Sequence, residues 1–253
     1  MKNELQELYK QVQEGSTRAM IRIARIYYWG LGVEPDTQKA IEWLRSAVEN
    51  GRKDANLLLG HVYYDMERTP ETDRKAWEAY QAACDVYSGF SFYIGRMLYE
   101  NRVSGYEDDR KRLEDAVDMI QDAYAVFDFN VIAGGLYIWK ICTELGDYDL
   151  AQYYYDGTES KLQDARDYNE WAYGLWELGE YEKALPYIEK CMQLEGAQDD
   201  PNILDTYAEI LYSVGRKVEA REQFDKCAEI YRQRDERRML RETQDKIEQK
   251  FGK

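Results

Sequence analysis

Apolar and small residues recur along the chain at intervals of four, a spacing that places them on one face of an α-helix. They also repeat over a longer distance, because residues 19–47 align with residues 55–83 at a period of 36. The matched pairs are Ala19 with Ala55, Ile23 with Leu59, Tyr27 with Tyr63, Ala40 with Ala76, and Ala47 with Ala83. Each unit holds two helical stretches joined by a short linker, so the pattern predicts successive helical hairpins.

A third unit is expected to begin near Phe90 and to carry an insertion at residues 104–109. Its apolar and small positions are Ile94, Gly95, Ala116 and Ala123. Three further units share a glycine followed five positions later by alanine, namely Gly146 with Ala151, Gly179 with Ala184, and Gly215 with Ala220. Glycine after a first helix fits a left-handed cap, and a small residue lets the second helix pack back closely. The sequence therefore predicts six hairpins.

Both ends of the chain predict helices that cover the repeats. Residues 3–13 place Leu5, Leu8, Tyr9 and Val12 on one face, and residues 236–251 form a polar helix with a thin apolar stripe. Open ends of a stack of repeats need such polar covers.

The motifs of these units resemble two repeat families. The first unit carries Tyr27, Gly30-Leu31-Gly32-Val33 and Lys39-Ala40, and it resembles the Sel1-like repeat, except that Ala24 stands where that family usually has glycine. The second unit lacks the glycine loop and has residues 66–69 instead. The three later units resemble tetratricopeptide repeats.

This resemblance implies an all-α fold, a right-handed α-α superhelical solenoid with capping helices at both ends. It further implies a division into an N-terminal cap at residues 1–15, Sel1-like repeats at 16–128, tetratricopeptide-like repeats at 129–233, and a C-terminal cap at 234–253. We expect these parts to form one continuous solenoid, because both families stack hairpins in the same way.

Composition and charge exclude several classes of protein. The chain has 253 residues, of which 44% are apolar and 33% charged, a balance typical of a folded chain. Its net charge of -15 argues against binding to nucleic acid or to anionic lipid. Acidic residues near the N-terminus do not fit a signal peptide, and the longest uncharged run, residues 129–139, is too short to span a bilayer. We therefore expect a cytoplasmic protein.

The sequence offers little for catalysis. His61 is the one histidine, and the four cysteines are far apart, at residues 84, 142, 191 and 227. We therefore expect no metal, no cofactor and no enzymatic activity. Gly134 and Gly135 lie in an apolar helical stretch, where close helix packing explains them. Cys191 and Cys227 hold the same position in successive units, and we expect both to be buried in the core.

Candidate binding residues form two columns on the first helices of the hairpins. One column reads Arg25, His61, Arg96, Lys140, Tyr173 and Glu209, and the other, three residues later, reads Tyr28, Tyr64, Tyr99, Thr143, Trp176 and Tyr212. Positions three apart share a helix face, so the columns lie side by side, with Trp29 next to them. They predict a concave groove that binds a ligand, unless the aromatic rings pack between neighbouring first helices.

Aromatic rings and arginine suit an extended peptide. The expected partner is a protein or peptide, with an acidic segment or a C-terminal carboxylate as one possibility. The sequence thus predicts a non-enzymatic scaffold or adaptor. Two alternatives stay open: a regulatory sensor of a small peptide or metabolite, and, less favoured, an enzyme with an unrecognised carboxylate site.

Overall fold

The computed structural model describes residues 2–126 and 131–252, and every regular element within these ranges is a helix. The chain begins with α1 (Lys2–Gln13) and ends with α14 (Arg237–Phe251). Between them lie six hairpins: α2 (Thr17–Trp29) with α3 (Thr37–Glu49), α4 (Ala55–Asp65) with α5 (Pro70–Cys84), α6 (Ser91–Tyr99) with α7 (Asp109–Ala125), α8 (Val131–Leu145) with α9 (Tyr148–Glu159), α10 (Ala165–Glu177) with α11 (Tyr181–Cys191), and α12 (Pro201–Ser213) with α13 (Lys217–Gln233). Short 3-10 turns, η1 (Ser88–Phe90) and η2 (Ala197–Asp199), precede α6 and α12.

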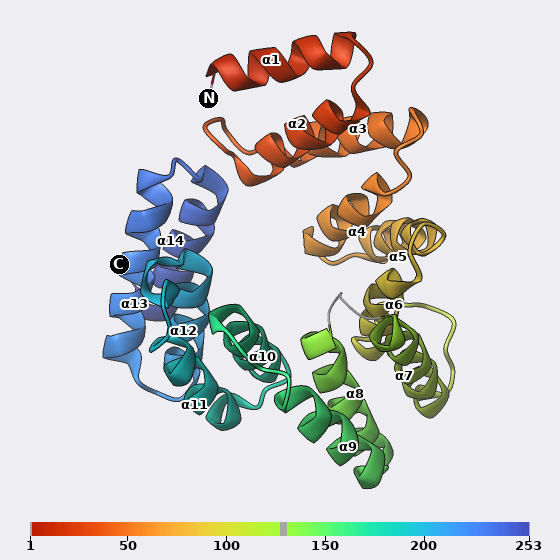
Figure 1. Ribbon diagram of the computed structural model, residues 1–253, viewed down its shortest axis with the longest axis vertical. Coiled ribbons are helices and arrows are strands. Elements are labelled where there is room, and N and C mark those ends of the chain that lie inside the picture. The colour runs from red at the N-terminus through yellow and green to blue at the C-terminus, as the bar shows by residue number, and fades with distance from the viewer. Residues whose placement is uncertain (1, 127–130, 253) are drawn as a thin grey trace.

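The hairpins follow one another around an arc, as Figure 1 shows, and confirm the predicted superhelix. The first helix of each pair, most plainly α4, α6, α10 and α12, lies toward the inside of the arc, and the second helix lies outside. The arc turns so far that α14 reaches α2. The predicted division into domains stays a prediction, and its boundary at residues 128–129 falls outside the described residues.

Small residues are buried where the repeat alignment requires close packing. Ala40, Ala76, Ala184 and Ala220 are each 0% exposed, which confirms the predicted packing positions. Cys191 and Cys227 are also fully buried, as expected, and each thiol donates to the carbonyl of the residue 26 positions earlier. Gly135 packs against α9 so closely that a Cβ atom there would lie 1.9 Å from Thr158 Oγ1. The core is therefore specified by residue size as much as by hydrophobicity.

Glycine ends the first helix of the later hairpins in the expected left-handed conformation. Gly179 has φ +80° and Gly215 has φ +87°, and the residue after each donates its N–H back to the carbonyl of Leu175 or Leu211. Only glycine adopts this backbone without steric cost.

Replacing Gly179 or Gly215 by alanine should therefore lower the free energy of unfolding by about 1 kcal/mol. Gly157 is the matched control, since it lies inside α9 without a positive φ, and a Cβ atom added there would have no neighbour within 4 Å. Alanine at Gly157 should raise stability, because alanine is the better helix former. Urea unfolding checks both signs, and equal effects at the three sites would contradict the assigned caps.

Candidate functional site

Local sequence fixes which side chains of α10 and α6 reach the concave face. Helix α10 begins with a capping box, in which Asp164 and Asp167 each accept from the other's backbone N–H. Trp171 and Leu175, four residues apart, are fully buried and orient the helix. Tyr173, Trp176 and Glu177 consequently lie on the remaining faces, toward α6 and α12. In α6, the buried side chains of Phe92, Met97 and Leu98 orient the helix in the same way. Arg96 and Tyr99 then face the groove.

The aromatic column joins neighbouring first helices. Most of its members bond a group near the end of the next first helix: Tyr28 donates to Asp65, Tyr64 to Glu100 (2.5 Å), Tyr99 to Glu144 (2.9 Å), and Trp176 to Ser213 (3.0 Å). Tyr212 donates to the carbonyl of Lys250 in α14 at 3.3 Å. Burial raises the pKa of Tyr28, Tyr64 and Tyr99, and the bonded carboxylates raise it further, so the hydroxyls stay protonated donors.

Thr143 departs from this pattern, since its hydroxyl donates to the carbonyl of Trp139 in its own helix. At this step the link comes from the other column. Lys140 Nζ in α8 lies 2.9 Å from Oε1 of Glu180, which caps α11 in the turn after α10. The rings thus lie between neighbouring first helices. The sequence had left this packing open as the alternative to a ligand-binding groove.

Arg96 is the centre of the basic column. Its Nε atom lies 2.8 Å from Glu100 Oε1, and its Nη2 atom lies 2.9 Å from Glu177 Oε1. The guanidinium also stands 5.0 Å from the ring centre of Tyr64 and 5.8 Å from that of Tyr137. Burial disfavours the charge, but Tyr137 and the two carboxylates hold the pKa of Arg96 above its usual value. Arg96 therefore links α6 to α10 across α8.

A hollow of about 340 Å³ opens beside Arg96 on the concave face. Eight residues line it: Arg96, Tyr99, Glu100, Tyr137, Trp176, Glu177, Leu178 and Tyr181. Three of them, Arg96, Tyr99 and Trp176, were predicted from the sequence, and Tyr64 and Tyr173 adjoin through their bonds to Glu100 and Glu177. Tyr173 and Tyr181 keep about two fifths of their surface exposed, at 40% and 41%. The hollow combines exposed aromatic surface with one cation and two carboxylates.

The two glutamates of this hollow were not among the residues predicted from the sequence. Glu100 follows Arg96 by four residues, and Glu177 follows Tyr173 by four, a spacing that brings side chains together on a helix. This local signal was present in the sequence. The approach of Glu177 to Arg96, 81 residues away, has no such signal.

The other predicted residues lie apart from the hollow. Tyr28 and Trp29 lie at the N-terminal end of the arc, beneath the Arg238 side chain of α14. Tyr212 packs against Phe251 at the C-terminal end, with ring centres 5.4 Å apart. Arg25 is exposed and makes no ion pair within the described part of the chain. Whether these residues bind a ligand stays a prediction.

His61 belongs to an aromatic cluster. Its Nδ1 atom lies 3.0 Å from Tyr80 Oη, and its ring meets that of Tyr93 edge-on at 4.6 Å. Burial lowers the pKa of His61, and Asp65 offsets part of this effect. The imidazole is therefore neutral, a hydrogen-bonding partner of Tyr80 and not a cation of the groove.

This lowered pKa predicts a loss of stability on acidification. Below about pH 6.5 the unfolded chain binds a proton at His61 that the folded chain binds only at lower pH, so stability falls as the pH falls through this window. His61→Gln removes the titration but keeps a polar group. The thermal midpoint of wild type should therefore drop more between pH 7.5 and about pH 5 than that of His61→Gln. Parallel curves would contradict the assignment.

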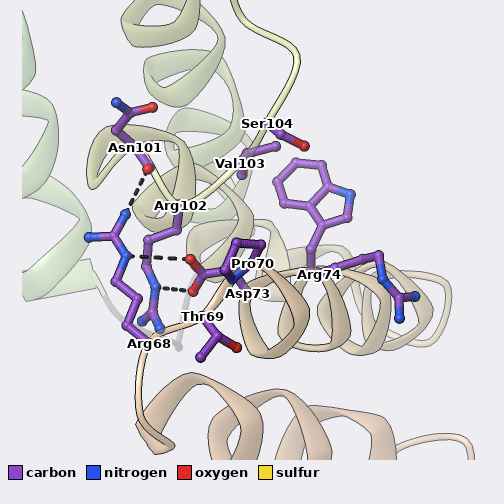
Figure 2. A pocket seen from close by; sticks show the side chains of 10 residues that line it. Arg68, Thr69, Pro70, Asp73, Arg74, Asn101, Arg102, Val103 and Ser104 are labelled. Carbon is purple, nitrogen blue, oxygen red and sulfur yellow. Dashed lines mark hydrogen bonds and ion pairs between the residues drawn. The ribbon is translucent and has the colours of Figure 1, made fainter.

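A larger hollow, of about 590 Å³, lies at the loops of the second and third hairpins (Figure 2). Three of its charged side chains bond one another. Asp73 Oδ1 lies 2.6 Å from Arg102 Nε, and Asp73 Oδ2 lies 3.4 Å from Arg68 Nε. Arg68 also donates to the carbonyl of Asn101 at 2.7 Å. These contacts tie the α4–α5 loop to the segment after α6, and they give this hollow a structural role.

Membrane-spanning helices and metal-binding clusters are both absent from the described ranges. Residues 2–126 and 131–252 contain no helix that is both long and apolar enough to cross a membrane. The same residues contain no group of three or more histidine, cysteine or acidic side chains placed to hold a metal ion.

Comparison with known proteins identifies repeats in the first and in the fifth hairpin. Residues 17–51 match the Sel1 repeat family, and residues 172–198 match the tetratricopeptide repeat family. Over 61 residues the chain is 39% identical to the ERAD-associated E3 ubiquitin-protein ligase component HRD3A of Arabidopsis thaliana. This stretch is 24% of the chain and 9% of that protein, so the match spans a small part of the relative's length.

Solved structures share the whole architecture. A tetratricopeptide repeat protein from Parabacteroides merdae has a TM-score of 0.55 at 14% identity, over 96% of this chain and 98% of its own. The protective antigen c5321 of uropathogenic Escherichia coli, which displays an SLR fold, has a TM-score of 0.52 at 19% identity, over 96% of this chain and 52% of its own. At these identities the likeness shows the fold alone.

Proposed function

We propose that this protein is a non-catalytic scaffold or adaptor that binds a segment of a partner protein across its concave face. Residues 17–51 match the Sel1 repeat family and residues 172–198 match the tetratricopeptide repeat family, and repeats of these families typically mediate protein–protein interactions. The observation that carries the proposal is the hollow beside Arg96. Aromatic rings there surround paired charges: Tyr181 is exposed, and Tyr99 and Trp176 are half-buried. Interface energy concentrates in tyrosine, tryptophan and arginine.

The charge balance of the hollow favours one kind of segment. Arg96 already bonds both Glu100 and Glu177, so the hollow has more carboxylates than cations. A peptide with a basic residue or a neutral donor complements this balance better than an acidic peptide does. An acidic segment or a C-terminal carboxylate fits instead at Arg25, whose guanidinium is exposed. We therefore assign a basic or neutral segment to the hollow, and an acidic segment would bind at Arg25.

Peptides selected from a phage-displayed random library against the full chain provide the test. Tyr181→Ala and Trp176→Ala should each weaken the binding of a selected peptide by about five- to thirtyfold, which corresponds to about 1 to 2 kcal/mol. Tyr153→Ala is the matched control, because Tyr153 is a tyrosine on outer helix α9 that is 71% exposed. Fluorescence anisotropy measures the three dissociation constants.

Unchanged binding by Tyr181→Ala and Trp176→Ala, together with weaker binding by Tyr153→Ala, would place the site on the convex face and overturn the proposal. The charges of the selected peptides give a separate result. A preference for acidic peptides whose binding depends on Arg25 would move the site to the N-terminal end of the arc.

A further inference from the structure

The two ends of the superhelix meet. Leu31, in the loop between α2 and α3, forms an isolated antiparallel bridge with Glu236, just before α14. The N–H of Gly32 donates to the carbonyl of Asp235 (3.1 Å), and the N–H of Arg237 donates to the carbonyl of Gly30 (3.3 Å). The contact joins residues more than 200 positions apart, and Figure 1 shows it where α14 approaches the first hairpin.

Charged side chains form most of this contact between residues 30–34 and 235–241, which is called the seam below. Glu34 pairs with Arg237 at 2.8 Å and with Arg241 at 2.9 Å, and all three side chains are at least 40% exposed. Both arginines lower the pKa of Glu34. Arg238 is more covered, at 19%, and its guanidinium lies 3.9 Å from the ring centre of Tyr28 and 5.5 Å from that of Trp29.

Hydrophobic packing holds the successive hairpins but not the seam. One buried apolar cluster runs through hairpins α2–α3 to α10–α11 and into α12, a second joins α1 to the first hairpin, and a third lies between α12, α13 and α14. Among the described residues, none of these clusters has members both in α14 and in the first hairpin. In a repeat stack each unit contacts only its neighbours. Within the described ranges, the seam is held instead by exposed ion pairs, two backbone hydrogen bonds and the contact of Arg238 with Tyr28.

We propose that α14 is an electrostatic latch, which closes the superhelix into a ring and covers Tyr28 and Trp29 at the N-terminal end of the concave face. Screening of the exposed pairs opens the ring, because the Debye length falls from about 10 Å at 0.1 M salt to about 3 Å at 1 M. The hairpins themselves keep their packing, since apolar burial is not screened. Opening then exposes Tyr28 and Trp29 to a partner.

A disulfide can lock the seam. The two flanking backbone bonds make Leu31 and Glu236 a non-hydrogen-bonded pair, whose Cα atoms lie about 4.5 Å apart in such ladders, within the range that a disulfide spans. The variant Leu31→Cys/Glu236→Cys should therefore cross-link readily under mild oxidation. Interference by native thiols is small, because burial raises the pKa of Cys84, Cys142 and Cys191 to about 11 and that of Cys227 to about 12.

The test measures ring closure by the cross-linking rate and by small-angle X-ray scattering. Between 0.1 M and about 1 M salt the reduced protein should expand, and the oxidised lock should not. In the double-cysteine background, Glu34→Gln should slow cross-linking by about two- to thirtyfold at low salt, since it removes two exposed pairs. Glu49→Gln, which removes an exposed carboxylate of the same hairpin away from the seam, is the control and should change nothing.

A charge swap provides the second variant. Glu34→Arg alone should open the ring, and Glu34→Arg combined with Arg237→Glu and Arg241→Glu should close it again. Rates and scattering curves that do not respond to salt or to Glu34→Gln would overturn the latch. Expansion of the oxidised lock in high salt would also overturn it, because the hairpins would then be separating elsewhere.

The covering of Tyr28 and Trp29 rests on the proposed function and has its own readout. Locked and Glu34→Gln proteins are compared for binding of the library peptides, with Tyr28→Phe/Trp29→Ala added in each. The cover is supported if the locked protein binds a peptide more weakly and reduction restores the binding. This difference between the locked and the reduced protein should disappear in the double variant. Equal binding by both forms overturns the cover alone. The proposed function fails separately, if neither form binds a peptide through Tyr181.

Discussion

Replacing Asp73 by alanine should lower the free energy of unfolding by about 3 to 5 kcal/mol, because it leaves the guanidinium of Arg102 buried without its counter-ion. The Arg102 side chain is 7% exposed and bonds Asp73 at 2.6 Å. It also donates to the carbonyl of Tyr64 and stacks on the Tyr64 ring at 3.8 Å, so it cannot swing into water without breaking these contacts. Urea unfolding followed by circular dichroism measures the loss.

The same carboxylate supplies the control. Arg68 also pairs with Asp73, but its side chain is 56% exposed, and Arg68→Ala should cost less than about 1 kcal/mol. The double variant Asp73→Ala/Arg102→Met should recover most of the loss, since no charge then remains buried. Equal losses for Arg68→Ala and Asp73→Ala would show that the pair is solvated and would contradict its structural role.

Trp171→Ala should also cost about 3 to 5 kcal/mol. Trp171 is 0% exposed in α10 and packs edge-on against Tyr155 and Tyr187 at ring-centre distances of 5.0 and 5.8 Å. Removing the indole leaves a cavity at the centre of the arc, between the fourth and fifth hairpins.

Trp171→Phe is the matched variant and should cost less. It keeps an aromatic ring and removes an indole N–H that has no hydrogen-bond partner among the described residues. Differential scanning calorimetry compares the two. If Trp171→Phe lowers stability as much as Trp171→Ala does, the loss of stability does not arise mainly from the cavity.

The hairpins were predictable because their signals are local. The alanines at positions 40, 76, 184 and 220 and the glycines at 179 and 215 each act within one hairpin, at a spacing that the chain repeats. Closure of the ring was not predictable. It depends on the small rotation between hairpins summed over the whole stack, and it brings Glu34 to Arg237 across 203 positions.

The candidate site was predictable in part for the same reason. The register predicted Arg96, Tyr99 and Trp176 on one face, and all three line the same hollow. The partners of the aromatic column were readable in principle, because an acid follows Tyr28 after 37 residues and Tyr64 after 36. The ion pair between Arg96 and Glu177 was not readable from the sequence, because Glu177 reaches Arg96 across α8 from a hairpin two steps away.

Hydrogen–deuterium exchange of the full chain with and without a library peptide tests the proposed binding most directly. A peptide in the hollow should slow exchange in α6, α8 and α10, which carry Arg96, Tyr137 and Trp176, and in the α10–α11 turn next to Tyr181. The outer helices α7 and α9, and α11 beyond its first turn, should exchange as in the free protein. Protection confined to those outer helices, or to the loops around Arg68 and Arg102, would contradict the concave site.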